Sequence, residues 1–131
     1  MSQFEEALAS RLTGFTGLTN LVSNRIYPVV LPENPTYPAV TYQRISAVRA
    51  SAMSTDTGLV QTRVQVSIWS TLYSEAKNVK EQVRAALQRW RGTVLGLVIE
   101  DTFIENETDL YQPEIPVYHL PVDATVHYVE V

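Results

Sequence analysis

The 131-residue sequence contains no cysteine and has only five glycines and two histidines. The lack of cysteine excludes thiolate chemistry, cysteine-ligated zinc and a disulfide scaffold, and it fits assembly in a reducing cytoplasm. Because the glycines stand singly, the chain has neither a phosphate-cradling glycine loop nor a Gly-x-Ser-x-Gly nucleophile motif. No segment approaches the ~18 consecutive apolar residues of a membrane span. The N-terminus has neither a basic region nor an apolar run, so we expect no signal peptide.

The charge balance is mildly acidic. Ten basic against fourteen acidic residues give a net charge of -4, which favours solubility and has the wrong sign for a protein that binds nucleic acid or an anionic membrane. The length suits one ordinary domain, which we expect to span residues 1–131. These features predict a soluble protein made inside the cell.

The segment from Leu59 to Trp69 organises the rest of the chain. Its residues alternate between apolar or small side chains and polar ones, which is the period of a strand with one buried face. We therefore predict a central strand here. From Thr71 the apolar residues recur at three- and four-residue steps as far as Trp90, which predicts a helix packed on the sheet.

The N-terminal half supplies a helix, an extended segment and a strand. Ser2-Gln3-Phe4-Glu5 matches a capping box, so a helix should begin there. Residues 25–38 are rich in proline and should form an extended crossing segment. Residues 39–47 are rich in strand formers. The small polar residues of 48–58 predict a long, mobile connection to the central strand.

The C-terminal half supplies two more strands. Gly92 stands where a cap should end the helix, and residues 93–105 predict a strand that is interrupted near Gly96. Residues 118–129 alternate again, and Pro121 predicts either an edge position or a missing amide turned away from a neighbour. The order is helix, extended segment, strand, strand, helix, strand, strand. It predicts an α+β fold with an antiparallel four-stranded sheet and helices on one face.

No group of residues in the sequence forms a convincing reactive site. His119, Asp123 and His127 share one strand face, but residues four apart on a strand lie ~13 Å apart, too far to share one ion. The acidic residues between Glu100 and Glu107 are typical of a solvated strand end. Asp56-Thr57-Gly58 resembles an aspartic protease tripeptide without a second copy. We therefore expect no enzyme, no metal and no cofactor.

The remaining charged residues favour contact with a protein. Arg44, Arg49 and Arg63 lie near the first two strands and suit a protein partner better than nucleic acid. The candidate interface residues are Arg44, Arg49, Met53, Asp56, Arg63, Glu100, Asp101 and Glu105. The basic and acidic members of this set are expected to face each other between neighbouring copies.

Taken together, these segments resemble the tail completion family of tailed bacteriophages. The resemblance rests on an ordered set of segments that covers nearly the whole chain. They are Arg25-Ile26-Tyr27-Pro28, Leu31-Pro32, Tyr37 to Ser46, Thr62 to Trp69, Tyr73 to Ala76, Val83 to Leu87, Asp109 to Glu114, and Tyr118 to Asp123. The chain departs from the family pattern at His119 and Leu120, where similar proteins often carry arginines.

The resemblance implies a virion structural protein similar to tail terminators. Such a protein forms a ring, commonly of six copies, on the head-proximal end of the tail tube, where it meets the tube protein and the head-tail connector protein. It would be made and assembled in the host cytoplasm, without contact to a membrane and without direct nucleic-acid sequence recognition. The alternatives are a head-side connector or neck protein, a small cytoplasmic ligand-binding or regulatory module, and an enzyme that uses the acidic strand end.

Overall fold

The computed structural model describes the backbone of residues 3–51 and 56–129 and the side chains of 4–48 and 59–129. Three helices and seven strands follow one another along this described part of the chain. They are α1 (Gln3–Thr13), α2 (Thr16–Val22), β1 (Ile26–Pro28), β2 (Ala39–Ser51), β3 (Asp56–Ser70), α3 (Tyr73–Leu87), β4 (Gly92–Val94), β5 (Leu97–Glu107), β6 (Leu110–Gln112) and β7 (Val117–Val129). The predicted α+β class is confirmed.

The seven strands form one sheet in the order β1-β2-β3-β7-β5-β4, with β6 also paired to β7. The four long strands are antiparallel neighbours, as predicted. The predicted count of four is nevertheless wrong, because three short strands extend the sheet. One of them, β1, pairs with β2 in parallel, and a three-residue strand gives too little alternation to detect from sequence.

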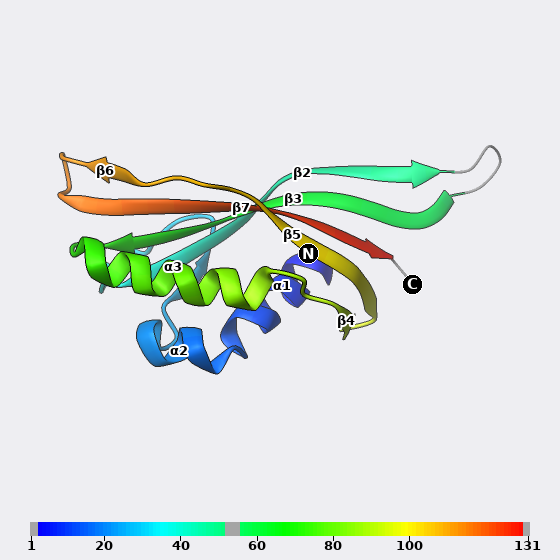
Figure 1. Ribbon diagram of the computed structural model, residues 1–131, viewed down its shortest axis with the longest axis horizontal. Helices are drawn as coiled ribbons and strands as arrows, with labels where there is room; N and C mark the ends of the chain where they lie inside the picture. Colours follow the sequence, from blue (N-terminus) through cyan, green and yellow to red (C-terminus); the bar gives the residue numbers. More distant parts are fainter. Residues whose placement is uncertain (1–2, 52–55, 130–131) are drawn as a thin grey trace.

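All three helices lie on one side of the curled sheet, and the ends of β2 and β3 reach beyond the helical layer (Figure 1). The core lies between the helices and the inward-facing residues of β3 and β7, as the alternation predicted. The fully buried members from these two strands are Val64, Val66, Ile68, Leu120, Val122, Ala124 and Val126. Burial of this continuous apolar face is the main stabilising contribution to the fold.

The helix that follows β3 ends earlier than predicted. It ends at Leu87, and Arg89 adopts a positive φ of 62° two residues later. The prediction of a cap at Gly92 is therefore wrong, and Gly92 begins β4 instead. Trp90 is buried, with 3% of its surface exposed, but it lies on the segment after the helix rather than on the helix stripe.

Two strand boundaries also differ from expectation. Residues 48–51 and 56–58 belong to β2 and β3, so the predicted long connection 48–58 is wrong. Residues 52–55 lie outside the described residues. The predicted interruption of the strand 93–105 near Gly96 is confirmed, but it separates two strands, because the chain reverses at Gly96 and β4 pairs back onto β5.

Pro121 lies in the interior of the sheet rather than at its edge. Its strand, β7, runs between β3 and β5. The carbonyl of Pro121 accepts a hydrogen bond from Thr108 N, between the ends of β5 and β6. Since N–H and C=O of one strand residue point the same way, the missing amide faces this interruption. The second alternative, a missing amide turned away from a neighbouring strand, is the correct one.

Candidate assembly interface

The β5 edge of the sheet is covered by the chain's own segment after α3. Arg89 N donates to Thr102 O at 2.8 Å, and Ile104 N donates to Gln88 Oε1 at 2.9 Å. The buried Thr102 hydroxyl donates to Trp90 O at 3.1 Å. The first two bonds occupy the carbonyl of Thr102 and the amide of Ile104 on the outer side of β5. The covered stretch of β5 is therefore not available for pairing with another strand.

Two arginines in and next to this covering segment pair with Asp101 on β5. Arg89 Nη1 and Arg91 Nη2 lie 2.8 and 3.2 Å from the Asp101 carboxylate. The hydrogen bond from Arg91 is the main cause that keeps the pKa of Asp101 below its usual value, and the Thr102 amide contributes in the same direction. The predicted interface residue Asp101 therefore has partners within its own chain.

An apolar side chain lies at the tip of the hairpin between β4 and β5. Val94 pairs with Leu97, so Leu95 and Gly96 form a two-residue turn with φ values of 50° and 83°. Such turns favour asparagine followed by glycine, because both residues need positive φ. Leucine in this conformation costs roughly 1–2 kcal/mol. Leu95 is also 54% exposed, so neither backbone preference nor core packing accounts for it.

The opposite edge of the sheet is open along most of its length. The pairing of β1 with β2 ends at Tyr42. Beyond it, the outer edge of β2 makes no backbone hydrogen bond to another segment within the described residues. The two lateral edges of the sheet thus differ: the β5 edge is covered in its middle, and the β2 edge is open.

A hollow of about 520 Å³ lies beside this open edge, between α1 and the first two strands. Its apolar lining comes from Ala9, Pro28, Val29 and Tyr42. The volume lies within the range of roughly 300–1,000 Å³ that is typical of binding pockets.

The charged rim of this hollow is acidic. Glu5, Glu6 and Arg44 line it. Arg44 Nε lies 3.2 Å from Glu5 Oε1, as an ion pair without the alignment of a hydrogen bond. Glu6 is exposed and makes no ion pair with another described residue. Burial, and secondarily the charge of Glu5, raise the pKa of Tyr42 above its ordinary value.

The apolar rim of the hollow is strained. Val29 has a φ of 64°, and Val30 N donates to Pro28 O at 2.7 Å across it, which makes a γ-turn centred on Val29. This turn is rare, and positive φ is an outlier for a β-branched residue. Val29 and Val30 are 59% and 69% exposed. Exposed apolar residues in a strained backbone are typical of contact sites.

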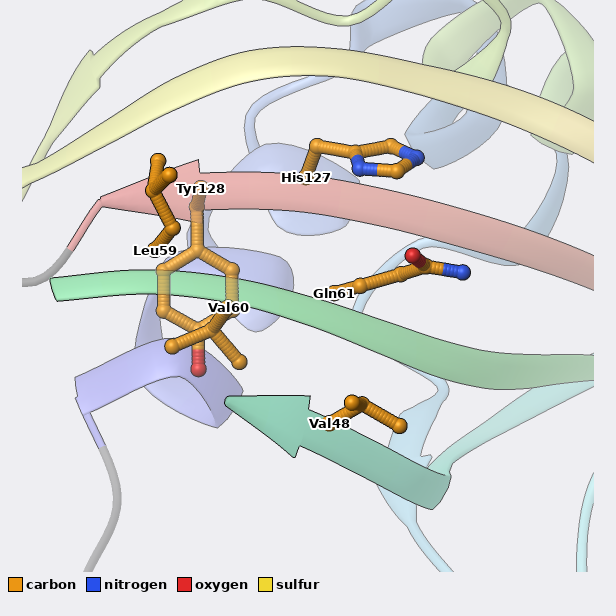
Figure 2. Close-up of a pocket in the computed structure, with 6 residues that line it drawn as sticks. All are labelled: Val48, Leu59, Val60, Gln61, His127 and Tyr128. Carbon is orange, nitrogen blue, oxygen red and sulfur yellow. The ribbon is translucent and has the colours of Figure 1, made fainter. Parts of the chain in front are cut away.

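A second, smaller hollow of about 220 Å³ lies where the β2–β3 hairpin meets β7. Figure 2 shows His127 and Gln61 near its mouth, with the Tyr128 ring directed to the opposite side of the sheet. That ring stacks on Phe4 at a centroid distance of 4.9 Å, and its hydroxyl accepts from Arg44 Nη2 at 2.7 Å. The floor of this hollow therefore belongs to the core.

The face of the sheet that no described helix covers (Figure 1) is called the open face below. It carries polar pairs rather than a reactive group. Trp69 stacks on His119 at 3.9 Å and donates to Thr41 Oγ1 at 3.0 Å. Burial lowers the pKa of His119 below its ordinary value. Among the described residues, no cluster of three or more histidines and acids is arranged to hold a metal. The other members of the expected face also have partners: Asp123 accepts from Gln65, and His127 packs edge-on to Phe103.

The structure distributes the predicted interface residues among several surfaces. Arg44 lies at the hollow beside α1. Arg63 is exposed and lies 3.8 Å from Asp123, and Arg63 and Glu105 line a shared shallow depression on the open face. Glu100 is exposed and makes no ion pair with another described residue. Arg49 lies on β2 and Asp56 on β3, but their side chains are outside the described part, as is all of Met53.

Sequence reasoning did not identify the residues that distinguish the two edges: Leu95, Val29 and Gln88. One signal was present, because Leu95-Gly96 between the strand formers Thr93-Val94 and Leu97-Val98 matches a two-residue turn with glycine in second place. No comparable signal marks Val29, whose backbone conformation depends on the pairing of its N–H with Tyr42 O at 2.9 Å.

The model of a family described as "Tail completion protein gp17" matches residues 6–128. A solved chain from "Virion of native gene transfer agent (GTA) particle" superposes with a TM-score of 0.80 at 15% sequence identity, over 95% of this chain and 93% of that one. At this identity the likeness shows the fold alone. No curated protein matches the sequence. No described helix is long and apolar enough to cross a membrane.

Proposed function

Because the chain belongs to the tail completion family of tailed bacteriophages, and is thus a structural protein of the virion tail, we propose that it is the subunit of a ring that caps the tail tube. The ring sits at the head-proximal end of the tube and takes part in joining the tail to the head. Its partners are other copies of itself, six in the expected ring, the tail tube protein and the head-tail connector protein. The chain acts as one domain over residues 1–131.

The observation that carries this proposal is the difference between the two lateral edges of the sheet. The β4–β5 edge presents an apolar tip at Leu95, and the β1–β2 edge presents an apolar hollow. Because the two edges differ, a contact that joins the β4–β5 edge of one copy to the β1–β2 edge of the next is head-to-tail. Head-to-tail contacts that close generate rings. The solved chain with the same fold comes from a virion particle, which agrees with a structural role.

The capping mechanism follows from the ring. Its lower face binds the last ring of the tube and occupies the surface that another tube subunit would use, so elongation stops. Its upper face then offers a fixed surface to the connector. Binding of this kind needs complementary surfaces but no covalent chemistry, which agrees with the structural role that the family indicates.

Deletion of the gene from the phage that encodes it tests the proposal. Electron microscopy of the lysate should show tails of abnormal length, or finished tails beside filled heads that they fail to join. Supplying the gene from a plasmid should restore complete particles. Heads that lose their DNA while tails stay normal would instead favour the head-side connector or neck protein. Infectious particles at the normal titre would contradict any role in the tail.

A further inference from the structure

We propose that, in this ring, the tip of the β4–β5 hairpin of one copy inserts into the hollow beside α1 of the next copy. Leu95 is the inserted side chain, and Ala9, Pro28, Val29 and Tyr42 form the receiving surface. This inference rests on the proposed ring, and it assigns the contact that holds neighbouring copies together.

The hairpin and the hollow adjoin opposite ends of the strand order and different residues of α1: the hairpin segment lies beside Ser10, Arg11 and Gly14, and the hollow beside Glu5, Glu6 and Ala9. The hairpin belongs to β4, the last strand on one side, and the hollow adjoins β1 and β2, the last strands on the other. The α1 helix, which contributes Ala9 to the hollow, runs beneath the sheet (Figure 1). Leu95 does not line the hollow of its own chain. When the hairpin of a neighbouring copy occupies the hollow, each copy gives one tip and receives one.

Both surfaces carry features that folding of a single copy does not require. Leu95 is exposed in a conformation that suits asparagine, and Val29 is exposed in a γ-turn that suits glycine. Burying the two side chains against each other removes apolar surface from water on both sides. Well-packed, desolvated pockets commonly carry much of the binding energy of an interface, and Tyr42 of the receiving surface is of a residue type enriched at such sites.

An exposed basic side chain lies beside the hairpin, and an exposed acidic one lies beside the hollow. Glu6, on the rim of the hollow, is exposed and has no ion pair within the described residues. Arg91 begins the segment that leads into the hairpin, and 55% of its side chain is exposed although it shares Asp101 with Arg89. An arginine beside the inserted tip and a glutamate beside the hollow favour this orientation of the two copies.

Cysteine crosslinking in assembled particles tests the contact directly, because the natural chain contains no cysteine. The double variant Ala9→Cys/Leu95→Cys is supplied to a phage that lacks the gene, and purified tails are treated with a short bismaleimide. We expect a ladder of crosslinked species from dimer to complete ring on a denaturing gel. The matched control is Ala9→Cys/Leu110→Cys, whose second thiol lies on β6, and it should stay monomeric.

A second variant separates loss of the contact from loss of folding. In Leu95→Asn the turn receives the residue that it favours, so the melting temperature should be equal to or higher than that of the natural protein. Incorporation into tails should nevertheless be lost. If Leu95→Asn enters tails and supports plaques as the natural protein does, the proposed contact is wrong.

The outcomes distinguish this inference from the proposed function. If the natural chain is absent from purified tails, the ring proposal itself fails. If the double-cysteine variant is present in infectious tails and remains monomeric after crosslinking, the ring proposal stands and the assigned contact is overturned. Crosslinking of both double variants alike would also overturn it, because the reaction would then lack specificity.

Discussion

The two lateral edges of this sheet differ in how their outward-facing backbone groups are paired. An exposed strand edge carries unpaired N–H and C=O groups that can recruit other strands. On β5 the segment from Gln88 to Trp90 satisfies the groups in the middle of the edge, whereas on β2 nothing in the described part of the chain does so beyond Tyr42. One edge is therefore closed in its middle by the chain itself, and the other is open; in the proposed ring the closed edge presents the tip and the hollow beside the open edge receives it.

The largest effect should follow from removing the anchor of the covered edge. Trp90→Ala empties a site that is 97% buried in the core, and should lower the free energy of unfolding by roughly 3–5 kcal/mol. Urea denaturation followed by circular dichroism measures it. Trp69→Ala is the control, since that ring lies half-buried on the open face, and its cost should be smaller. An equal or smaller cost for Trp90→Ala would show that Trp90 does not anchor the edge.

The next effect should appear in assembly and leave folding intact. Leu95→Asp places a charge where the account requires an apolar tip, and should weaken each contact between copies by about 2 kcal/mol or more. Plaque formation by a phage that depends on the variant should be lost, with the melting temperature nearly unchanged. Leu110→Asp, at a similarly exposed leucine on β6, is the control and should keep the copy-to-copy contact. Normal plaque counts with Leu95→Asp would contradict the difference between the edges.

A smaller effect should follow from uncovering β5 at one point. Gln88→Ala removes the acceptor of the Ile104 amide, and should cost about 0.5–1.5 kcal/mol of stability. Hydrogen exchange at the Ile104 amide should become faster, as at an open edge. Gln61→Ala, on the exposed face of β3, is the matched control and should change neither quantity. Unchanged exchange at Ile104 would mean that the side chain of Gln88 does not cover the edge.

The smallest effect concerns the arginines around Asp101. The folded-state pKa of Asp101 is lowered, so its stabilising contribution is complete above the ordinary pKa of aspartate and is lost as the pH falls through the folded-state value. Arg91→Ala removes the main cause and should move this pKa upward toward its ordinary value. An NMR titration of the side-chain carboxyl carbon measures the shift. Arg84→Ala, which removes a partner of Glu81, should leave it unchanged. A midpoint for Asp101 that stays the same in Arg91→Ala would assign the lowered pKa to other groups.

Sequence patterns predicted the parts of the fold that depend on burial. The alternation in β3 and β7 and the apolar stripe of α3 reflect one continuous buried face, so both strands and the body of the helix were placed correctly. Features that depend on single backbone angles were not predicted: the positive φ of Arg89 ended the helix region before Gly92. Pro121 was ambiguous because a sheet interior tolerates proline where two neighbouring strands leave a gap.

The candidate site was predictable only in part. Charged residues such as Arg44 and Asp101 are visible in a sequence, but their partners within the chain are not. Arg44 contacts Glu5 and Tyr128, and Asp101 is shared by two arginines, because the fold joins segments that are distant in sequence. Leu95 and Val29 resemble ordinary core residues until the fold exposes them.

Electron cryomicroscopy of the head-proximal end of the tail tests the central claim most directly. The account predicts a closed ring of this chain on the last ring of the tube, in which the Leu95 tip of each copy lies against Ala9 and Val29 of the next. A ring in which like edges face each other, or a tail end that contains no copy of this chain, would contradict it.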